Sequence, residues 1–563
     1  MRPDQPTTSQ SLAQASSGWD RTQVTELVFQ FEDGHCSQRA FAQTTGVPRS
    51  TLQHWLKRKH ELEADPALVA FFESPTGLAF LHRLVGACHL TFTQQGTCGI
   101  RLVCAFLRRS GLDRFVASSF GSQQALARQL EHVLLDYGAR QRSALASQMT
   151  PKRITVCEDE TFHPQVCLVS IEPVSDFILL EVYCQGRDAA SWTTQLTTAL
   201  EGLPVEVVQA TSDEAKGLLA HARDGLGAHH SPDLFHVQHD LSKATGLALR
   251  AQLSRAQADR DAADQQTQRW IARRDASQQG PRRPGRPPEF ERHIAEGRAL
   301  EQARTARVDA AQRRQEQMRQ AIRGVGEDYH PFDLARGRPC DAEAVRRRLT
   351  ARFDAIERIA EQAALATTAR QRIAKARRVL EAMVATLAWV WVVIGTRLDV
   401  LCLTPPLKVV VIEQLIAGLY LVRVAAQARS PAERVAITAV ADHLLAHARA
   451  PDGPLAALPA ERRETLECEA VWCAALFQRS SSCVEGRNGQ LALRHHHLHQ
   501  LRPRKLKVLT ILHNYLIRRP DGTTAAERFF GTKPQDLFEY VLDRLDVPAR
   551  PAAPRSTRNR SAA

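Results

Sequence analysis

Between residues 151 and 240, short runs of alternating apolar and polar residues are separated by turn residues and by stretches of helical periodicity. The runs ITVCEDE, QVCLVSIE and FILLEVYC follow one another closely, which is typical of three antiparallel strands. A helical stretch, DAASWTTQLTTALEGL, precedes a fourth strand at VEVVQA, and DEAKGLLAHARDGL is again helical. A short run, LFHVQ, predicts a fifth strand before more helix. The pattern therefore predicts an α/β unit.

The remaining chain has the spacing of helices. Two long, charged, Ala-rich stretches in residues 245–330 flank the sequence GPRRPGRPP, from Gly280 to Pro288, and predict an antiparallel hairpin with a Pro-rich tip. The tip is either a plain connector or a minor-groove reader, because RPGRP resembles the core of an AT-hook with Arg286 at its centre. A second helical block follows at 331–478. Its apolar run from Ala382 to Thr396 is shorter than the ~18–20 residues of a membrane span, and we expect a buried helix.

The strand order places two acids where they can meet. Three antiparallel strands, helix, strand, helix, strand, helix is the order of the ribonuclease-H-like fold, in which strand four lies beside strand one. Asp159 stands near the end of strand one and Asp213 follows strand four. Alternation alone does not choose between Asp159 and its neighbours Glu158 and Glu160. Adjacent carboxylates repel unless a divalent cation lies between them, so the pair suits Mg²⁺.

The sequence QRAFAQTTGVPRSTLQHWLKRK, from Gln38, fits a helix-turn-helix. Ala42 is small where two helices would cross, and Gly46 can take a positive φ in the turn. A second helix would present four side chains to the major groove and three cations to phosphates. These are, in order, Arg49, Thr51, Gln53 and His54, followed by Lys57, Arg58 and Lys59. The alternative is an ordinary helical hairpin. A second such unit within residues 61–150 would begin at GIRLVCAFLRRSGLDRFV.

Composition adds a preference for a polyanionic partner. The 563 residues contain 74 Lys and Arg against 61 Asp and Glu, a net charge of +13. None of the 12 Cys forms a CxxC pair, which argues against structural zinc. The N-terminal sequence lacks the apolar segment of a secretory signal, so we expect reduced thiols and a soluble, cytoplasmic protein.

The segment from Phe477 to Arg519 has nine Lys or Arg and one acid, Glu485. Ser482 and Glu485 have the spacing of a capping box, in which Glu485 would accept a backbone N–H; the alternative is a metal ligand. The histidines at 495–497 and His499 lack a convincing third zinc ligand, and we expect them to be donors beside a phosphate track. The cations expected along that track are Arg487, Arg494, Arg502, Arg504, Lys505 and Lys507.

Four motifs, in this order and spacing, resemble the landmarks of DDE-type transposases of bacterial insertion sequences. They are DETF, SDEAKGL, SPDLFHVQHDL and SSCVEGRNGQL. The resemblance implies that Asp159, Asp213 and Glu485 hold Mg²⁺ or Mn²⁺, with two ions bound. Asp233 is the rival for the second acid. The resemblance also implies that Phe235, His236 and Val237 mark strand five.

The resemblance implies phosphodiester hydrolysis and strand transfer on double-stranded DNA, at transposon ends and targets. The enzyme would act as a homo-oligomer on DNA, associated with the bacterial nucleoid, without a membrane or small-molecule substrate. The alternative is a catalytically silent, transposase-derived DNA-binding protein or regulator. A helix-turn-helix reads duplex DNA, which argues against an RNA-directed nuclease of the same fold.

The expected fold class is an α/β ribonuclease-H-like core, a mixed five-stranded sheet with helices, interrupted by a large all-α insertion and preceded by a helix-turn-helix region. The expected segments are a disordered terminus (1–20), the helix-turn-helix domain (21–60), a helical region (61–150), the first part of the core (151–244), the helical hairpin (245–330), the helical insertion (331–478), the C-terminal part of the core carrying Glu485 (479–545) and a basic disordered tail (546–563).

Overall fold

The computed structural model describes residues 18–162, 165–281, 285–286, 288–428, 430–498 and 501–552. Predictions for residues 1–17, for His499, for part of the Pro-rich tip and for the tail beyond residue 552 lie outside the described residues. The chain forms two compact units. One comprises residues 1–149 and 493–563, and the other comprises residues 150–492.

The second unit contains a mixed five-stranded sheet. The strands are β1 (Lys152–Phe162), β2 (Val166–Glu172), β3 (Phe177–Cys184), β4 (Val205–Ser212) and β5 (His229–Pro232). Their order is β3-β2-β1-β4-β5; β1–β2 and β2–β3 are antiparallel, while β1–β4 and β4–β5 are parallel. The first four strands lie where the alternation of apolar and polar residues predicted them, and strand four lies beside strand one as predicted. This sheet is compatible with a ribonuclease-H-like core.

The fifth strand lies earlier than predicted. Residues 229–232 form β5, and LFHVQ instead opens the helix α10 (Leu234–Gln279). The reason is Asp233, whose carboxylate accepts a hydrogen bond from the Phe235 amide at 2.8 Å and caps the helix. Phe235, His236 and Val237 are therefore helical, and their assignment to strand five was wrong.

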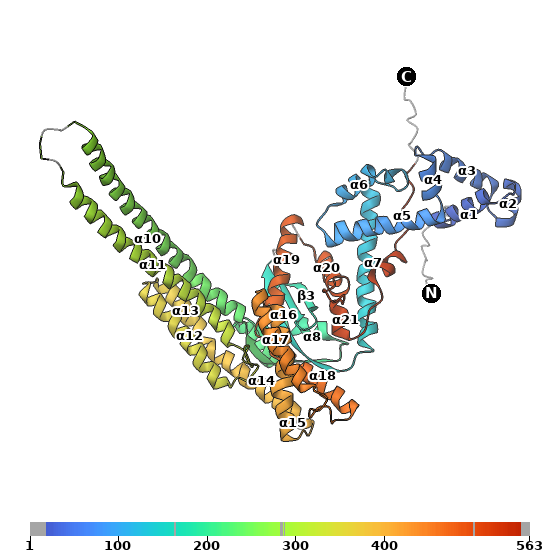
Figure 1. Cartoon of the computed structure of the whole chain (residues 1–563). Coiled ribbons are helices and arrows are strands. Elements are labelled where there is room, and N and C mark those ends of the chain that lie inside the picture. The colour runs from blue at the N-terminus through green and yellow to red at the C-terminus, as the bar shows by residue number, and fades with distance from the viewer. Residues whose placement is uncertain are drawn as a thin grey trace, which may run out of the picture. The chain divides into compact units, whose positions relative to one another are not determined.

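Helices make up the rest of this unit. α10 runs antiparallel to α11 (Phe290–Asp328), as the hairpin prediction required (Figure 1). The others are α8 (Ala189–Leu200), α9 (Lys216–Ala220), η3 (His221–Gly225), α12 (Ala342–Gln362), α13 (Thr367–Arg378), α14 (Leu380–Val400), α15 (Pro405–Val410), η4 (Val411–Ile416), α16 (Ala417–Gln427), α17 (Pro431–Ala448), α18 (Ala460–Leu476) and α19 (Ser482–Leu498), of which the last continues beyond the unit.

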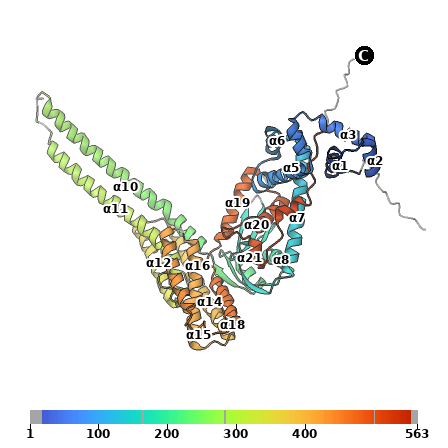
Figure 2. The same ribbon diagram turned by 45° about the vertical axis from the view of Figure 1, so that its right-hand side comes forward.

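A single apolar core joins the helices from α10 to α18, several of which are visible together in Figure 2. α14 contains the apolar run from 382 to 396, and its residues Met383, Leu387 and Val390 are fully buried there, as predicted. Two helical stretches among the described residues, Thr367–Val400 and Pro405–Gln427, are long and apolar enough to cross a membrane. Both contribute side chains to this core.

The first unit is helical in its described residues. It contains α1 (Arg21–Asp33), α2 (Gln38–Thr45), α3 (Arg49–His60), α4 (Pro66–Phe72), α5 (Pro75–Cys88), η1 (His89–Gln95), α6 (Ile100–Arg109), η2 (Leu112–Arg114), α7 (Phe120–Ala146), α20 (Pro503–Tyr515), α21 (Ala525–Phe530) and α22 (Leu537–Leu542). Gly46 ends α2 with a φ of 73°, and Leu52 and Trp55 on α3 are buried beside Phe41. After α6, one turn of 3-10 helix stands where a second helix-turn-helix unit would need a full helix.

Candidate metal centre

Three side chains from distant parts of the sequence converge in the second unit. They are Asp159 on β1, His236 in the first turn of α10 and Glu485 in the first turn of α19. One potential ligand atom of each lies within 4.8 Å of the other two, and each residue is partly buried. We call this group the Asp-His-Glu cluster.

The sheet explains why Asp159, and not a neighbouring acid, belongs to the cluster. Parallel pairing of β1 with β4 ends at Cys157, so Asp159 lies beyond the paired part of that edge. Glu158 points the other way and is fully buried near Ser170 and His221. Glu160 forms an ion pair with Arg187 at 3.1 Å. Packing therefore selects Asp159 from the three consecutive acids, Glu158, Asp159 and Glu160, among which the sequence pattern did not choose.

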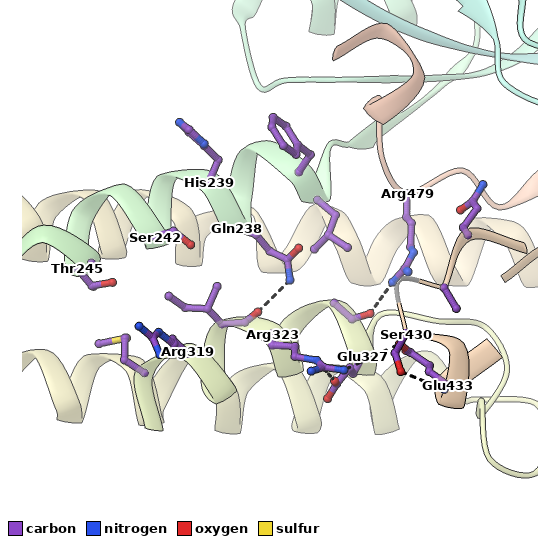
Figure 3. A pocket seen from close by; sticks show the side chains of 18 of the residues that line it. Gln238, His239, Ser242, Thr245, Arg319, Arg323, Glu327, Ser430, Glu433 and Arg479 are labelled. Atoms are coloured by element: carbon purple, nitrogen blue, oxygen red, sulfur yellow. Dashed lines mark hydrogen bonds and ion pairs between the residues drawn. The ribbon is translucent and has the colours of Figure 1, made fainter. Parts of the chain in front are cut away.

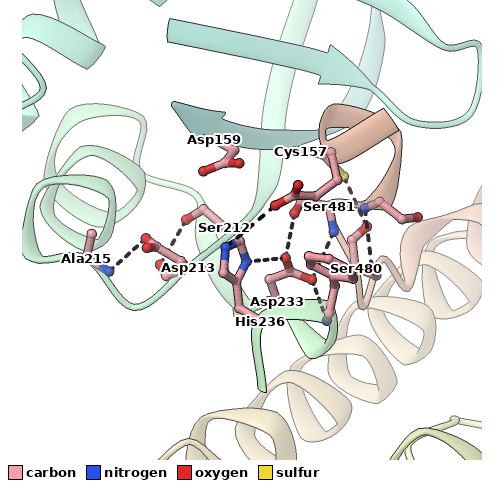
Figure 4. A network of polar contacts seen from close by, with 12 residues as sticks. Cys157, Asp159, Ser212, Asp213, Ala215, Asp233, His236, Ser480 and Ser481 are labelled. Carbon is pink, nitrogen blue, oxygen red and sulfur yellow. Dashed lines mark hydrogen bonds and ion pairs between the residues drawn. The ribbon is translucent and has the colours of Figure 1, made fainter. Parts of the chain in front are cut away.

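Asp233 orients the histidine of the cluster. Its buried carboxylate accepts hydrogen bonds from His236 Nδ1 at 2.7 Å and from the amide and hydroxyl of Ser481 at 3.1 and 2.5 Å (Figure 4). With the Phe235 amide, this makes four donors on one carboxylate. Asp233 therefore holds the first turn of α10 and the start of α19 together.

The charges of Asp233 and His236 are coupled. Burial raises the pKa of Asp233, but the hydrogen bonds from His236 and Ser481 outweigh it and hold the pKa below its ordinary value. The hydrogen bond to Asp233 raises the pKa of His236 to about 9, against the effect of its own burial. The Nε2 atom of His236 lies 3.6 Å from Glu485 Oε1. The Nε2 side of the imidazole thus faces the acids of the cluster.

Asp159 has the electrostatics of a cation ligand. Burial, followed by the nearby Glu485 carboxylate, raises the pKa of Asp159 to about 7. Asn488, one turn after Glu485, donates from Nδ2 to Asp159 Oδ2 at 3.0 Å and fixes the carboxylate. Two repelling carboxylates and one imidazole within reach of a common point fit a divalent cation.

Glu485 does not complete a capping box. Among the described residues, no recorded hydrogen bond joins its carboxylate to the Ser482 amide, and its recorded partner is His236. Its own amide donates to the Ser481 carbonyl at 3.1 Å within the first turn. The position at the helix start therefore presents the carboxylate to the cluster.

Asp213 follows β4 as predicted but lies outside the cluster. Its Oδ1 accepts a hydrogen bond from the Ala215 amide at 2.9 Å, which closes the turn after the strand (Figure 4). The third member of the cluster is His236, which the sequence analysis did not identify as a potential ligand. The available signal was the spacing of Asp233 and His236, since residues three apart share a helix face.

Several cations expected to contact phosphates have partners within the protein. Arg487 forms a buried ion pair with Glu181, and Lys59 is buried against Glu32; both predictions were wrong because neither charge is on the surface. Arg494 donates to backbone carbonyls of residues 94–96, and Lys505 donates to the Thr93 carbonyl at 2.8 Å.

Other predicted DNA contacts are exposed. These are Arg49, Gln53, His54, Lys57, Arg286, Arg502, Arg504 and Lys507, while Thr51 and Arg58 are partly buried. Arg504 lies 3.4 Å from Glu131, and Arg286 lies 3.2 Å from Glu289. His496 and His497 are also exposed, and among the described residues they belong to no group of potential metal ligands.

Comparison with known proteins gives one partial match. A family model described as a family of unknown function (DUF6399) matches residues 411–557. Neither curated proteins nor solved structures gave a match. The matched segment begins in η4 and includes α19, and so covers Glu485 but not Asp159 or His236.

Proposed function

We propose that this chain cleaves and joins DNA strands by a metal-dependent reaction, in the manner of a DDE-type transposase. The observation that supports it best is the convergence of Asp159, His236 and Glu485. The parallel neighbours β1 and β4 bring Asp159 and Asp213 to the same edge of the sheet, as the resemblance requires.

In this proposal Asp159 and Glu485 hold a divalent cation, Mg²⁺ or Mn²⁺, with His236 as a third donor. Such a cation stabilises the charge that develops on the oxygens of an in-line phosphodiester displacement. Asp233 fixes the orientation of His236, and Asn488 that of Asp159. The cluster itself offers ligands for one ion, and the second ion implied by the resemblance would require Asp213.

DNA recognition is proposed for the α2–α3 pair of the first unit. The exposed side chains of Arg49, Gln53 and His54 lie on α3 and would read the major groove, with Lys57 on a phosphate. The partner is then double-stranded DNA in the bacterial cytoplasm, at transposon ends and targets, and assembly on DNA would give a homo-oligomer.

A nicking assay on supercoiled plasmid tests the proposal. We expect nicking that requires Mg²⁺ or Mn²⁺ and falls roughly 100-fold or more in Asp159→Asn and Glu485→Gln, because an amide cannot supply the negative charge of a ligand. Both variants should keep the parental melting temperature. Parental nicking by Glu485→Gln would refute the assignment, and DNA binding without any nicking would favour the catalytically silent alternative.

The variant Asp213→Asn tests whether Asp213, which lies outside the cluster, is needed for cleavage. An Asn side chain can still accept the Ala215 hydrogen bond, so the turn should persist. We expect the same loss of nicking, because Asp213 lies at the strand end beside β1 and would join the metal site when DNA binds. Full activity would assign the chemistry to the Asp-His-Glu cluster alone.

A further inference from the structure

A groove of about 1110 Å³ in the second unit is lined by α10 and α11 together with the end of α16 and the start of α17 (Figure 3). Leu234, Met318 and Ile322 form its apolar floor. Gln238 of α10 donates to the Ile322 carbonyl of α11 at 3.0 Å and so links the two helices. Its volume exceeds the roughly 300–1,000 Å³ of typical small-molecule sites, which suits a segment of a polymer.

One residue of the groove, Phe235, directly precedes His236 of the Asp-His-Glu cluster. The Phe235 side chain lines the groove and is 36% exposed. Its ring centroid lies 5.7 Å from that of His236, in the cluster, and 5.8 Å from that of His239. Phe235 and His239 are stacked at 25° and offer an aromatic surface next to the metal centre.

The groove also carries positive charge that the protein only partly neutralises. Arg250 is exposed, and no ion pair is recorded for it among the described residues. Arg319 is exposed and lies 3.6 Å from Glu316 on its own helix. Arg479 is largely buried, donates to the carbonyls of Gly326 and Tyr329, and is attracted by the charge of Glu433. Arg323, by contrast, is paired with Glu327 and Glu433.

We propose that this groove binds single-stranded DNA that extends from the metal centre. An unpaired strand needs flat aromatic faces for its bases and cations along its backbone, and the groove supplies both, with Phe235 next to His236 of the cluster. Phe235 and His239 would stack on bases, while the exposed Arg250 and Arg319 would face phosphates. The inference rests on the proposed function, because that function supplies DNA as the ligand of the adjacent site.

The test is a binding titration of the full chain without divalent metal, using a fluorescent oligothymidine of about 15 nucleotides and a hairpin duplex. We expect Phe235→Ala and Arg250→Glu each to weaken oligothymidine binding by roughly 5- to 100-fold, with duplex affinity within about twofold of parental. Phe235→Tyr should retain binding, because it keeps the aromatic face. Arg307→Glu is the matched control, an exposed arginine on α11 outside the groove.

Three results would overturn the inference. They are unchanged oligothymidine affinity in well-folded Phe235→Ala and Arg250→Glu, an equal loss in Arg307→Glu, or an equal loss of duplex binding. If Phe235→Ala unfolds, Arg319→Glu takes its place, because its side chain is exposed. Since no metal is present, strand binding is measured independently of cleavage. Intact groove binding without nicking would thus refute the proposed function alone.

Discussion

Arg487 and Glu181 form an ion pair whose side chains are 4% and 0% exposed, with two hydrogen bonds of 2.6 and 2.7 Å. Removing one partner leaves the other charge buried, so Arg487→Met should lower the free energy of unfolding by about 3–5 kcal/mol. Urea denaturation measures this. The control is Arg153→Met, whose ion pair with Glu206 is exposed and contributes about 0–1 kcal/mol. Similar losses of unfolding free energy in both variants would contradict the larger contribution expected of the buried ion pair.

His229 makes the second unit sensitive to acid. Its ring stacks on Trp389 with centroids 4.4 Å apart, and burial, followed by the charge of Arg223, lowers the pKa of His229 to about 4. The unfolded chain binds the proton near pH 6.5, so the folded state loses stability as pH falls from 6.5 towards 4. His229→Phe should remove roughly 1–3 kcal/mol of that loss. Melting curves between pH 7 and 4.5 measure it, and parallel curves for both proteins would contradict it.

At the scale of one helix, α3 carries two lysines that differ in exposure and therefore in expected role. Lys57 is 73% exposed, whereas Lys59 is 8% exposed and contacts Glu32. Lys57→Met should weaken duplex binding and reduce the salt slope by about one, with no change in melting temperature. Lys59→Met should instead destabilise the first unit by roughly 1–2 kcal/mol. A change of salt slope in Lys59→Met and not in Lys57→Met would reverse these roles.

Elements were more predictable from sequence than the partners of individual side chains. The first four strands follow from alternation, and the hairpin α10–α11 from helical spacing. β5 was misplaced because a short apolar run reads as a strand until a capping aspartate starts a helix within it. Arg487 was misjudged because its partner lies 306 residues away. His236 was missed as a ligand because its segment was assigned to a strand, which hid its helical spacing from Asp233.

At the scale of the molecule, the apolar core of the second unit includes side chains of α10 as far as Leu249 and of α11 from Met318 onward. α10 ends at Gln279 and α11 begins at Phe290, and Arg286 pairs with Glu289. Replacing residues 280–288 by a short turn should leave the melting temperature unchanged and lower A·T-rich and G·C-rich DNA affinity equally or not at all. Binding titrations on both sequences measure this. A selective loss on A·T-rich DNA would instead assign Arg286 to a minor groove.

The bond between Asp233 and Ser481 has a consequence for protein synthesis. The two residues are 248 positions apart, and α19 with Glu485 follows directly after Ser481. At about 5–20 residues per second, a ribosome needs roughly 12–50 s to translate the interval. Throughout that time the nascent chain carries Asp159 and His236 without Glu485. A polypeptide abandoned by the ribosome in this window would have the α2–α3 pair but lack the third side chain of the Asp-His-Glu cluster; under the proposed function, such a product would compete for DNA without cutting it.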